Sequence, residues 1–161
     1  VGGGDATSPD SIQRAMDFYA ALGKRPIHVR REIAGHIANR LQAALWREAF
    51  HLVDQGVASV SDIDTAIAHG PGLRWALMGP FMNLHLSGGQ GGMQHLLEHL
   101  GGPIESWWRD LGNPAMTEAL KDSVVQGVAE ARGMRREEEL ERTRDELLTD
   151  LIRAKVQGSL F

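Results

Sequence analysis

The sequence predicts an all-α domain, and three observations support this prediction. Apolar residues recur at helical spacing along most of the chain. Glycine and proline stand where one helical pattern ends and the next begins. A single short segment alternates like a strand, and no partner strand for it is evident. With 161 residues and 42% hydrophobic content, the chain is long and apolar enough to form one domain with a core.

The first helix is expected to begin at Pro9. Ser8 can cap it, Pro9 is preorganised for the first helical position, and Gly23 ends it. The alternating run from Arg25 to Arg30 follows. It is short, so it favours an extended connector or an isolated ladder.

The segment from Gly35 to Gly56 is predicted to be one long, buried central helix. Its apolar residues occupy one helical face, and a second set widens that face nearly all round; together they are Ile37, Ala38, Leu41, Ala44, Leu45, Trp46, Ala49, Phe50, Leu52 and Val53. Asn39 lies in the first turns of this helix. A buried amide must find a partner, so Asn39 is the first candidate functional residue.

The remaining elements follow in order. Ser61 to Asp64 resembles a capping box for a short helix that ends at Gly70, and Gly70-Pro71-Gly72 forces a turn. The segment Leu73 to Leu86 is mostly apolar, and Ser87 to Gly92 is a glycine-rich loop. Three further helices are expected: one from Met93 that stops at Gly101-Gly102, one that starts at Asn113-Pro114, and a charged one from Arg135 to Val156 whose narrow apolar stripe faces solvent or a partner.

Composition excludes several classes of function. The net charge of -4 provides no basic surface for nucleic acid or an anionic membrane. No apolar run approaches the roughly 20 residues of a membrane span, and no signal peptide is expected. The chain has no cysteine, which fits a reducing compartment, and we expect a cytoplasmic protein.

Two motifs suggest a ligand, but both favour a plainer interpretation. The glycine-rich loop lacks the preceding strand and the spacing of a dinucleotide or phosphate loop, so a tight turn between helices is favoured. His95 and His99 lie four residues apart, as metal ligands on a helix do. No third ligand is evident, and we predict no metal.

Arg74 and Trp75 lie in an apolar stretch just beyond the glycine turn. An arginine there must pair with an acid, either within the protein or on a ligand. Composition favours a structural ion pair slightly over a substrate clamp. The adjacent Trp107 and Trp108 cannot both face the same way on a helix, so one of them is a candidate to line a cleft or an interface.

Three parts of the chain carry a resemblance to a known family. They are residues 35–41 (GHIANRL), residues 56–64 (GVASVSDID) and residues 79–81 (GPF). Together they resemble the helical C-terminal domain of the 3-hydroxyacyl-CoA dehydrogenase family, over almost the whole chain. The resemblance implies a multi-helix fold of the 6-phosphogluconate dehydrogenase C-terminal-like type.

Within that family, three short runs resemble the branch that oxidises small free hydroxy acids such as carnitine and gulonate. They are residues 72–75 (GLRW), residues 78–79 (MG) and residues 87–93 (SGGQGGM). Two departures from the acyl-CoA pattern point the same way. Ala34-Gly35-His36 replaces the usual Pro-Gly-Phe, and His85 occupies the place of the acid expected after Gly-Pro-Phe.

The resemblance also implies the organisation of the whole protein. Residues 1–8 would be a stub from the end of an N-terminal Rossmann domain that binds NAD, and residues 9–161 the helical substrate-binding and dimerisation domain. Asn39 would assist at the reacting oxygen, and Arg74, Trp75, His36 and Phe81 would contact the substrate. No NAD-binding residue and no metal ligand are assigned in this chain.

The resemblance thus implies an NAD-dependent dehydrogenase that oxidises the 3-hydroxyl of a small, carnitine-like acid, acting as a homodimer. One alternative is a 3-hydroxyacyl-CoA or 3-hydroxybutyryl-CoA dehydrogenase. An alternative of another class is a helical dimerisation module without chemistry. This chain alone is expected to fold but to be inactive, because hydride transfer needs a nicotinamide that it cannot hold.

Overall fold

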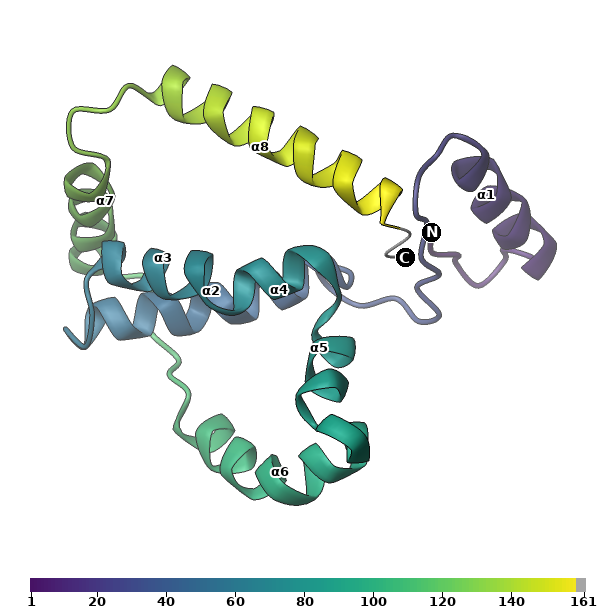
Figure 1. Ribbon diagram of the computed structural model, residues 1–161, viewed down its shortest axis with the longest axis horizontal. Coiled ribbons are helices and arrows are strands. Elements are labelled where there is room, and N and C mark those ends of the chain that lie inside the picture. Colours follow the sequence, from purple (N-terminus) through teal and green to yellow (C-terminus); the bar gives the residue numbers. More distant parts are fainter. Residues whose placement is uncertain (159–161) are drawn as a thin grey trace. The chain divides into compact units, whose positions relative to one another are not determined.

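The computed structural model describes residues 1–158, and their regular structure is helical, with one isolated β-bridge (Figure 1). The all-α prediction is confirmed. The helices are α1 (Pro9–Ala21), α2 (Ala38–Asp54), α3 (Val60–His69), α4 (Pro71–Leu77), α5 (Pro80–Ser87), the short 3₁₀ turn η1 (Gly89–Gly91), α6 (Gly92–Asp110), α7 (Glu118–Arg132) and α8 (Glu137–Gln157). Within residues 1–158, no helix is both long and apolar enough to cross a membrane.

The chain divides into two compact units, Val1–Arg47 and the part that begins at Glu48. In the first unit, α1 begins as predicted, because the Ser8 hydroxyl accepts the Ser11 N–H at 3.2 Å and Pro9 opens the helix. Gly2 and Val29 form the isolated parallel bridge, in which the Val29 N–H donates to the Val1 carbonyl at 2.8 Å. The alternating segment is therefore an extended connector that meets the first residues of the chain at this single bridge.

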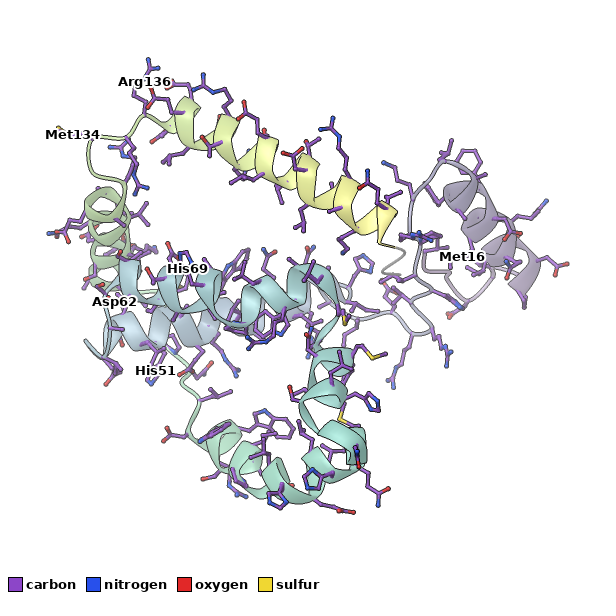
Figure 2. The ribbon with its side chains drawn as sticks, viewed as in Figure 1. Met16, His51, Asp62, His69, Met134 and Arg136 are labelled. Atoms are coloured by element: carbon purple, nitrogen blue, oxygen red, sulfur yellow. The ribbon has the colours of Figure 1, made fainter. Side chains whose placement is uncertain are left out.

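In the second unit, the start of α3 differs from the prediction. Its N-cap is Ser59 rather than Ser61, and the acidic third residue is Asp62 rather than Asp64. The Asp62 N–H donates to the Ser59 hydroxyl at 3.1 Å, and the Asp62 carboxylate accepts from the Ser59 hydroxyl and backbone N–H. These hydrogen bonds lower the pKa of Asp62 below its ordinary value of 3.8. Figure 2 shows Asp62 at this end of α3.

Helices α5 and α6 contact each other and are joined by the glycine-rich loop, which turns the chain from one helix into the other (Figure 1). His85 is exposed, and its Nδ1 atom accepts the Met93 N–H at 3.1 Å, so it caps the start of α6. Gly92 has a φ of +57°, and a side chain there would also meet the His85 ring. The loop is thus a tight turn between helices.

Two other predicted boundaries are wrong. Helix α6 continues through Gly101-Gly102 to Asp110, although Pro103 inside it can donate no backbone hydrogen bond. Helix α7 does not start at Asn113-Pro114. It starts at Glu118, where the Thr117 hydroxyl accepts the Leu120 N–H at 3.2 Å.

The prediction that the central helix is buried is also wrong for a single chain. Helix α2 has no buried residue, and Leu41 is 60% exposed. Among the described residues, the buried large hydrophobic side chains are Leu96 and Leu120. The segment is therefore helical as predicted, but none of its residues is buried in the part of the chain that the structure describes.

The second half of α2 contacts the segment between α6 and α7. The N–H of the buried Gly112 donates to Glu48 Oε2 at 2.8 Å. A Cβ atom at Gly112 would collide with the ring of His51, which Figure 2 labels on α2. This position therefore accepts only glycine in the present packing.

Gly112→Ala should lower the free energy of unfolding by about 1–3 kcal/mol, because the added methyl group must displace the His51 ring. Gly101→Ala is the matched control. Gly101 lies inside α6 with open space around its Cα, so alanine should raise stability by about 0.5–1 kcal/mol. Urea unfolding of the three proteins measures both effects, and equal stabilities for the two variants would contradict this packing.

Candidate functional site

The turn that precedes α2 carries two of the predicted site residues, His36 and Asn39. Gly35 has a φ of +77°, and His36 follows with a φ of +50°. Among residues 1–158, His36 is the one non-glycine residue with positive φ, a backbone conformation that costs energy and often occurs at functional sites. The Gly35-His36 pair is therefore a constrained corner at the start of α2.

His36 also lines a hollow of about 290 Å³ in the first unit. Its other lining residues are Gly2, Gly3, Gly4, Val29 and Glu32. Three consecutive glycines leave the backbone of this wall open to a ligand or to another part of the protein. His36 and Glu32 are the ionisable side chains at this hollow.

Asn39 lies in the first turn of α2 and is exposed. The expectation of a buried amide is wrong, because the apolar face around it is uncovered in this chain. Its side chain forms no hydrogen bond with another group in residues 1–158. The amide is therefore free to donate and accept at a ligand.

Arg74 and Trp75 lie on α4 in the second unit, and both are exposed. Within the described part of the chain, no carboxylate lies within 4.0 Å of the Arg74 guanidinium, so the structural ion pair that composition favours is not formed there. A planar guanidinium without a partner can bind a carboxylate through two parallel hydrogen bonds.

Phe81 lies in the first turn of α5 and is 77% exposed. Three other aromatic side chains of this unit are also exposed: Trp75, Trp107 and Trp108. Aromatic side chains in a core are covered by their neighbours. Exposed ones suit contact with a ligand or with another protein surface.

Asn83 fixes the corner between α4 and α5, and the sequence analysis did not identify it. Its side-chain amide donates to the carbonyls of Arg74, Met78 and Gly79 at 3.1, 2.9 and 3.0 Å. These hydrogen bonds fix the backbone between α4, which contains Arg74, and α5, which contains Phe81. The available signal was a single amide inside the apolar stretch from Leu73 to Leu86.

The predicted site residues thus fall into two groups. His36 and Asn39 belong to the first unit, and Arg74, Trp75 and Phe81 to the second. The first group lies at the Gly35-His36 corner that precedes α2, and the second lies around the corner between α4 and α5.

Neither a metal centre nor a dinucleotide cradle is formed by the described residues. The His95 and His99 rings lie against each other with centroids 4.9 Å apart, and residues 1–158 contain no group of three metal-ligating side chains. The glycine-rich loop joins two helices, whereas a dinucleotide loop joins a strand to a helix. The residues present do not fit NAD.

Comparison with known proteins identifies the family. Residues 35–122 match the family model described as "3-hydroxyacyl-CoA dehydrogenase, C-terminal domain". The chain therefore belongs to the 3-hydroxyacyl-CoA dehydrogenase family and contains its C-terminal domain.

Curated relatives are similar along nearly the whole chain. A protein of Burkholderia mallei named L-carnitine dehydrogenase is 49% identical over 94% of this chain and 47% of its own length. One of the same name from Pseudomonas aeruginosa is 48% identical over 96% of this chain and 48% of its own length. The chain thus spans about half the length of these relatives.

The fold also matches a solved structure. It is titled as a 5-formyl-3-hydroxy-2-methylpyridine 4-carboxylic acid 5-dehydrogenase, an NAD⁺-dependent dismutase. The TM-score is 0.70 at 23% sequence identity, and the match covers 96% of this chain and 49% of that one. At this identity the likeness supports the fold.

Proposed function

We propose that this chain is the substrate-binding domain of an NAD-dependent dehydrogenase that oxidises the 3-hydroxyl of a small, carnitine-like acid to the 3-keto acid. The observation that carries the proposal is the identity of nearly one half, over almost the whole chain, with proteins named L-carnitine dehydrogenase. The matching family model supports the same reaction type, oxidation of a 3-hydroxyl group.

The α4–α5 corner would bind the two ends of the substrate. Arg74 would hold the carboxylate, because its guanidinium has no acidic partner in residues 1–158 and its fork matches a carboxylate. Carnitine also carries a trimethylammonium group. Trp75 or Phe81 would face this group through cation–π contact, worth about 2 kcal/mol when desolvated.

The corner at the start of α2 would bind the reacting part of the substrate. Asn39 would donate a hydrogen bond from its amide to the 3-oxygen, where negative charge develops during oxidation. His36 would contact the substrate from the adjacent turn, in place of the phenylalanine usual in the acyl-CoA enzymes. A smaller, more polar contact of this kind favours a free acid over a long acyl chain.

NAD would be held mainly by an N-terminal Rossmann domain, with residues 1–8 as the end of that domain and residues 9–161 as the helical domain. The residues described here do not fit a dinucleotide, so we assign them no step through the cofactor. This division explains why the chain matches about half of its relatives' length. It also means that this chain alone is inactive.

A 3-hydroxyacyl-CoA dehydrogenase is the second candidate, because the matching family model carries that name. A thioester has no free carboxylate, so Arg74 would then have no partner on the substrate. The two candidates therefore differ in whether the Arg74 guanidinium binds a carboxylate of the substrate.

A homodimer formed through this domain is part of the proposal. The support is the set of exposed apolar side chains on α2, among them Leu41 and Trp46, which are 60% and 51% exposed. A two-fold contact between identical faces is the commonest way to cover such a surface.

In the full-length enzyme, Asn39→Ala should lower kcat about 100-fold, because one positioned hydrogen-bonding group at the reacting oxygen is removed. Steady-state kinetics with NAD measure this. The exposed position of Asn39 predicts little change in stability. An unchanged kcat would show that Asn39 does not act at the substrate.

A substrate panel on the full-length enzyme should show a clear preference for carnitine over gulonate, 3-hydroxybutyrate and 3-hydroxybutyryl-CoA. Arg74→Met should raise KM for the free acid at least tenfold, because the carboxylate loses its partner. Arg109→Met is the matched control, since Arg109 is an exposed arginine on α6 that lies near Glu105. Preference for the CoA thioester, with Arg74→Met silent, would favour the second candidate.

A further inference from the structure

The C-terminal end of α4 presents backbone carbonyls that need donors from outside the helix. The last four carbonyls of a helix have no N–H one turn further on, and in α4 they belong to residues 74–77. The Met78 N–H donates to the Arg74 carbonyl at 2.9 Å. Pro80, four residues after Ala76, has no N–H to give. Side chains supply the further donors at this end.

Asn83, on α5, donates to three carbonyls at this corner. Its Nδ2 atom lies 3.1 Å or less from the carbonyl oxygens of Arg74, Met78 and Gly79. These contacts also fix which way round the amide lies, because the reversed amide would place its oxygen against three other oxygens. Asparagine is a poor helix former, so its place in α5 is explained by these bonds and not by the helix itself.

Lys155, on α8, supplies the donor for Ala76. Both helices belong to the second unit, and Lys155 Nζ donates to the Ala76 carbonyl at 2.9 Å. Residues 151–152, one turn before Lys155, are apolar, so α8 offers it no acid at that spacing. Arg153, by contrast, pairs with Asp150 of the same helix. An ammonium at the C-terminal end of a helix also suits the helix dipole.

The end of α7 shows what an arginine does beside open carbonyls of this kind. Arg135 follows α7, and its guanidinium donates to the carbonyls of the last two residues of that helix. Arg74 lies in the last turn of α4, where Asn83 and Lys155 already pair the carbonyls. Within the described part of the chain, the Arg74 guanidinium forms no hydrogen bond. The two donors thus spare it for a ligand.

We propose that Asn83 is a positioning residue for the substrate carboxylate. By pairing the carbonyls at the end of α4, its amide keeps the Arg74 guanidinium available to the substrate. The same hydrogen bonds hold the end of α4 against the start of α5, where Phe81 lies. Lys155 acts in the same way from α8, through one hydrogen bond. This inference rests on the proposed function and names residues that act through Arg74 without touching the substrate.

Loss of the Asn83 amide would set up a competition for the Arg74 guanidinium. Carbonyl oxygens that lose their donor are acceptors, and the planar fork of a guanidinium can donate to them as it does to a carboxylate. The substrate carboxylate would then have to displace these carbonyls in order to bind. The reacting 3-oxygen is not involved, so KM should rise while kcat stays the same.

In the full-length enzyme, Asn83→Leu should raise KM for carnitine about tenfold and change kcat by less than about twofold. Asn113→Leu is the matched control, because Asn113 is an exposed asparagine after α6 and should leave KM unchanged. Carnitinamide, in which a neutral amide replaces the carboxylate, should show nearly the same KM with Asn83→Leu as with the unaltered enzyme. Steady-state kinetics at saturating NAD measure all three.

A double-mutant cycle separates positioning from a general loss of structure. Asn83→Leu should add nothing to the KM of Arg74→Met, because the guanidinium that it would occupy is already absent. Lys155→Met should raise KM about threefold and should likewise be silent beside Arg74→Met. Arg153→Met, on the same helix, is its control. If circular dichroism shows that Asn83→Leu does not fold, Lys155→Met carries the test.

An unchanged KM for carnitine in Asn83→Leu and Lys155→Met would overturn the inference. An equal rise with carnitinamide, or a rise that adds to that of Arg74→Met, would also overturn it, since the effect would not pass through the guanidinium. In each case a raised KM for Arg74→Met alone would leave the proposed function standing. If Arg74→Met alone is silent, the proposed use of Arg74 is wrong and the inference fails with it, so the two failures are distinguishable.

Discussion

The apolar surface of α2 is the constraint on which the rest of this structure depends. Helix formation there follows from the sequence, but burial does not: none of the residues of α2 is buried in the described part of the chain. A helix with apolar residues on most sides is stable in water only when other surfaces cover it. The proposed homodimer would cover this face of the helix.

The candidate site depends on the local backbone and not on burial. In it, short corners of backbone fix exposed polar side chains. Gly35 and His36 set the start of α2 with positive φ values, and Asn83 ties the end of α4 to the start of α5. Sites placed at such corners keep their geometry while the side chains stay free for a ligand. This arrangement suits a domain that supplies substrate contacts, whereas the chemistry of the nicotinamide would come from elsewhere in the enzyme.

Local signals in the sequence predicted the fold better than they predicted burial. The Ser8-Pro9 start of α1 is confirmed because a cap depends on neighbouring residues only. Ser59 and Ser61 both have an acidic residue three positions later, so the pattern could not distinguish the true cap of α3. The exposure of Asn39 and the role of Asn83 depend on packing between elements, which no local pattern contains. The site residues, by contrast, are implied by the resemblance to the family and not by any local pattern.

Sedimentation equilibrium of the chain across a wide concentration range tests the central claim, that a second copy covers the apolar face of α2. The account predicts a species of about twice the 17.6 kDa chain mass at micromolar concentration, which dissociates on dilution with loss of stability. A species of 17.6 kDa that unfolds cooperatively, with the same midpoint at every concentration, would contradict it.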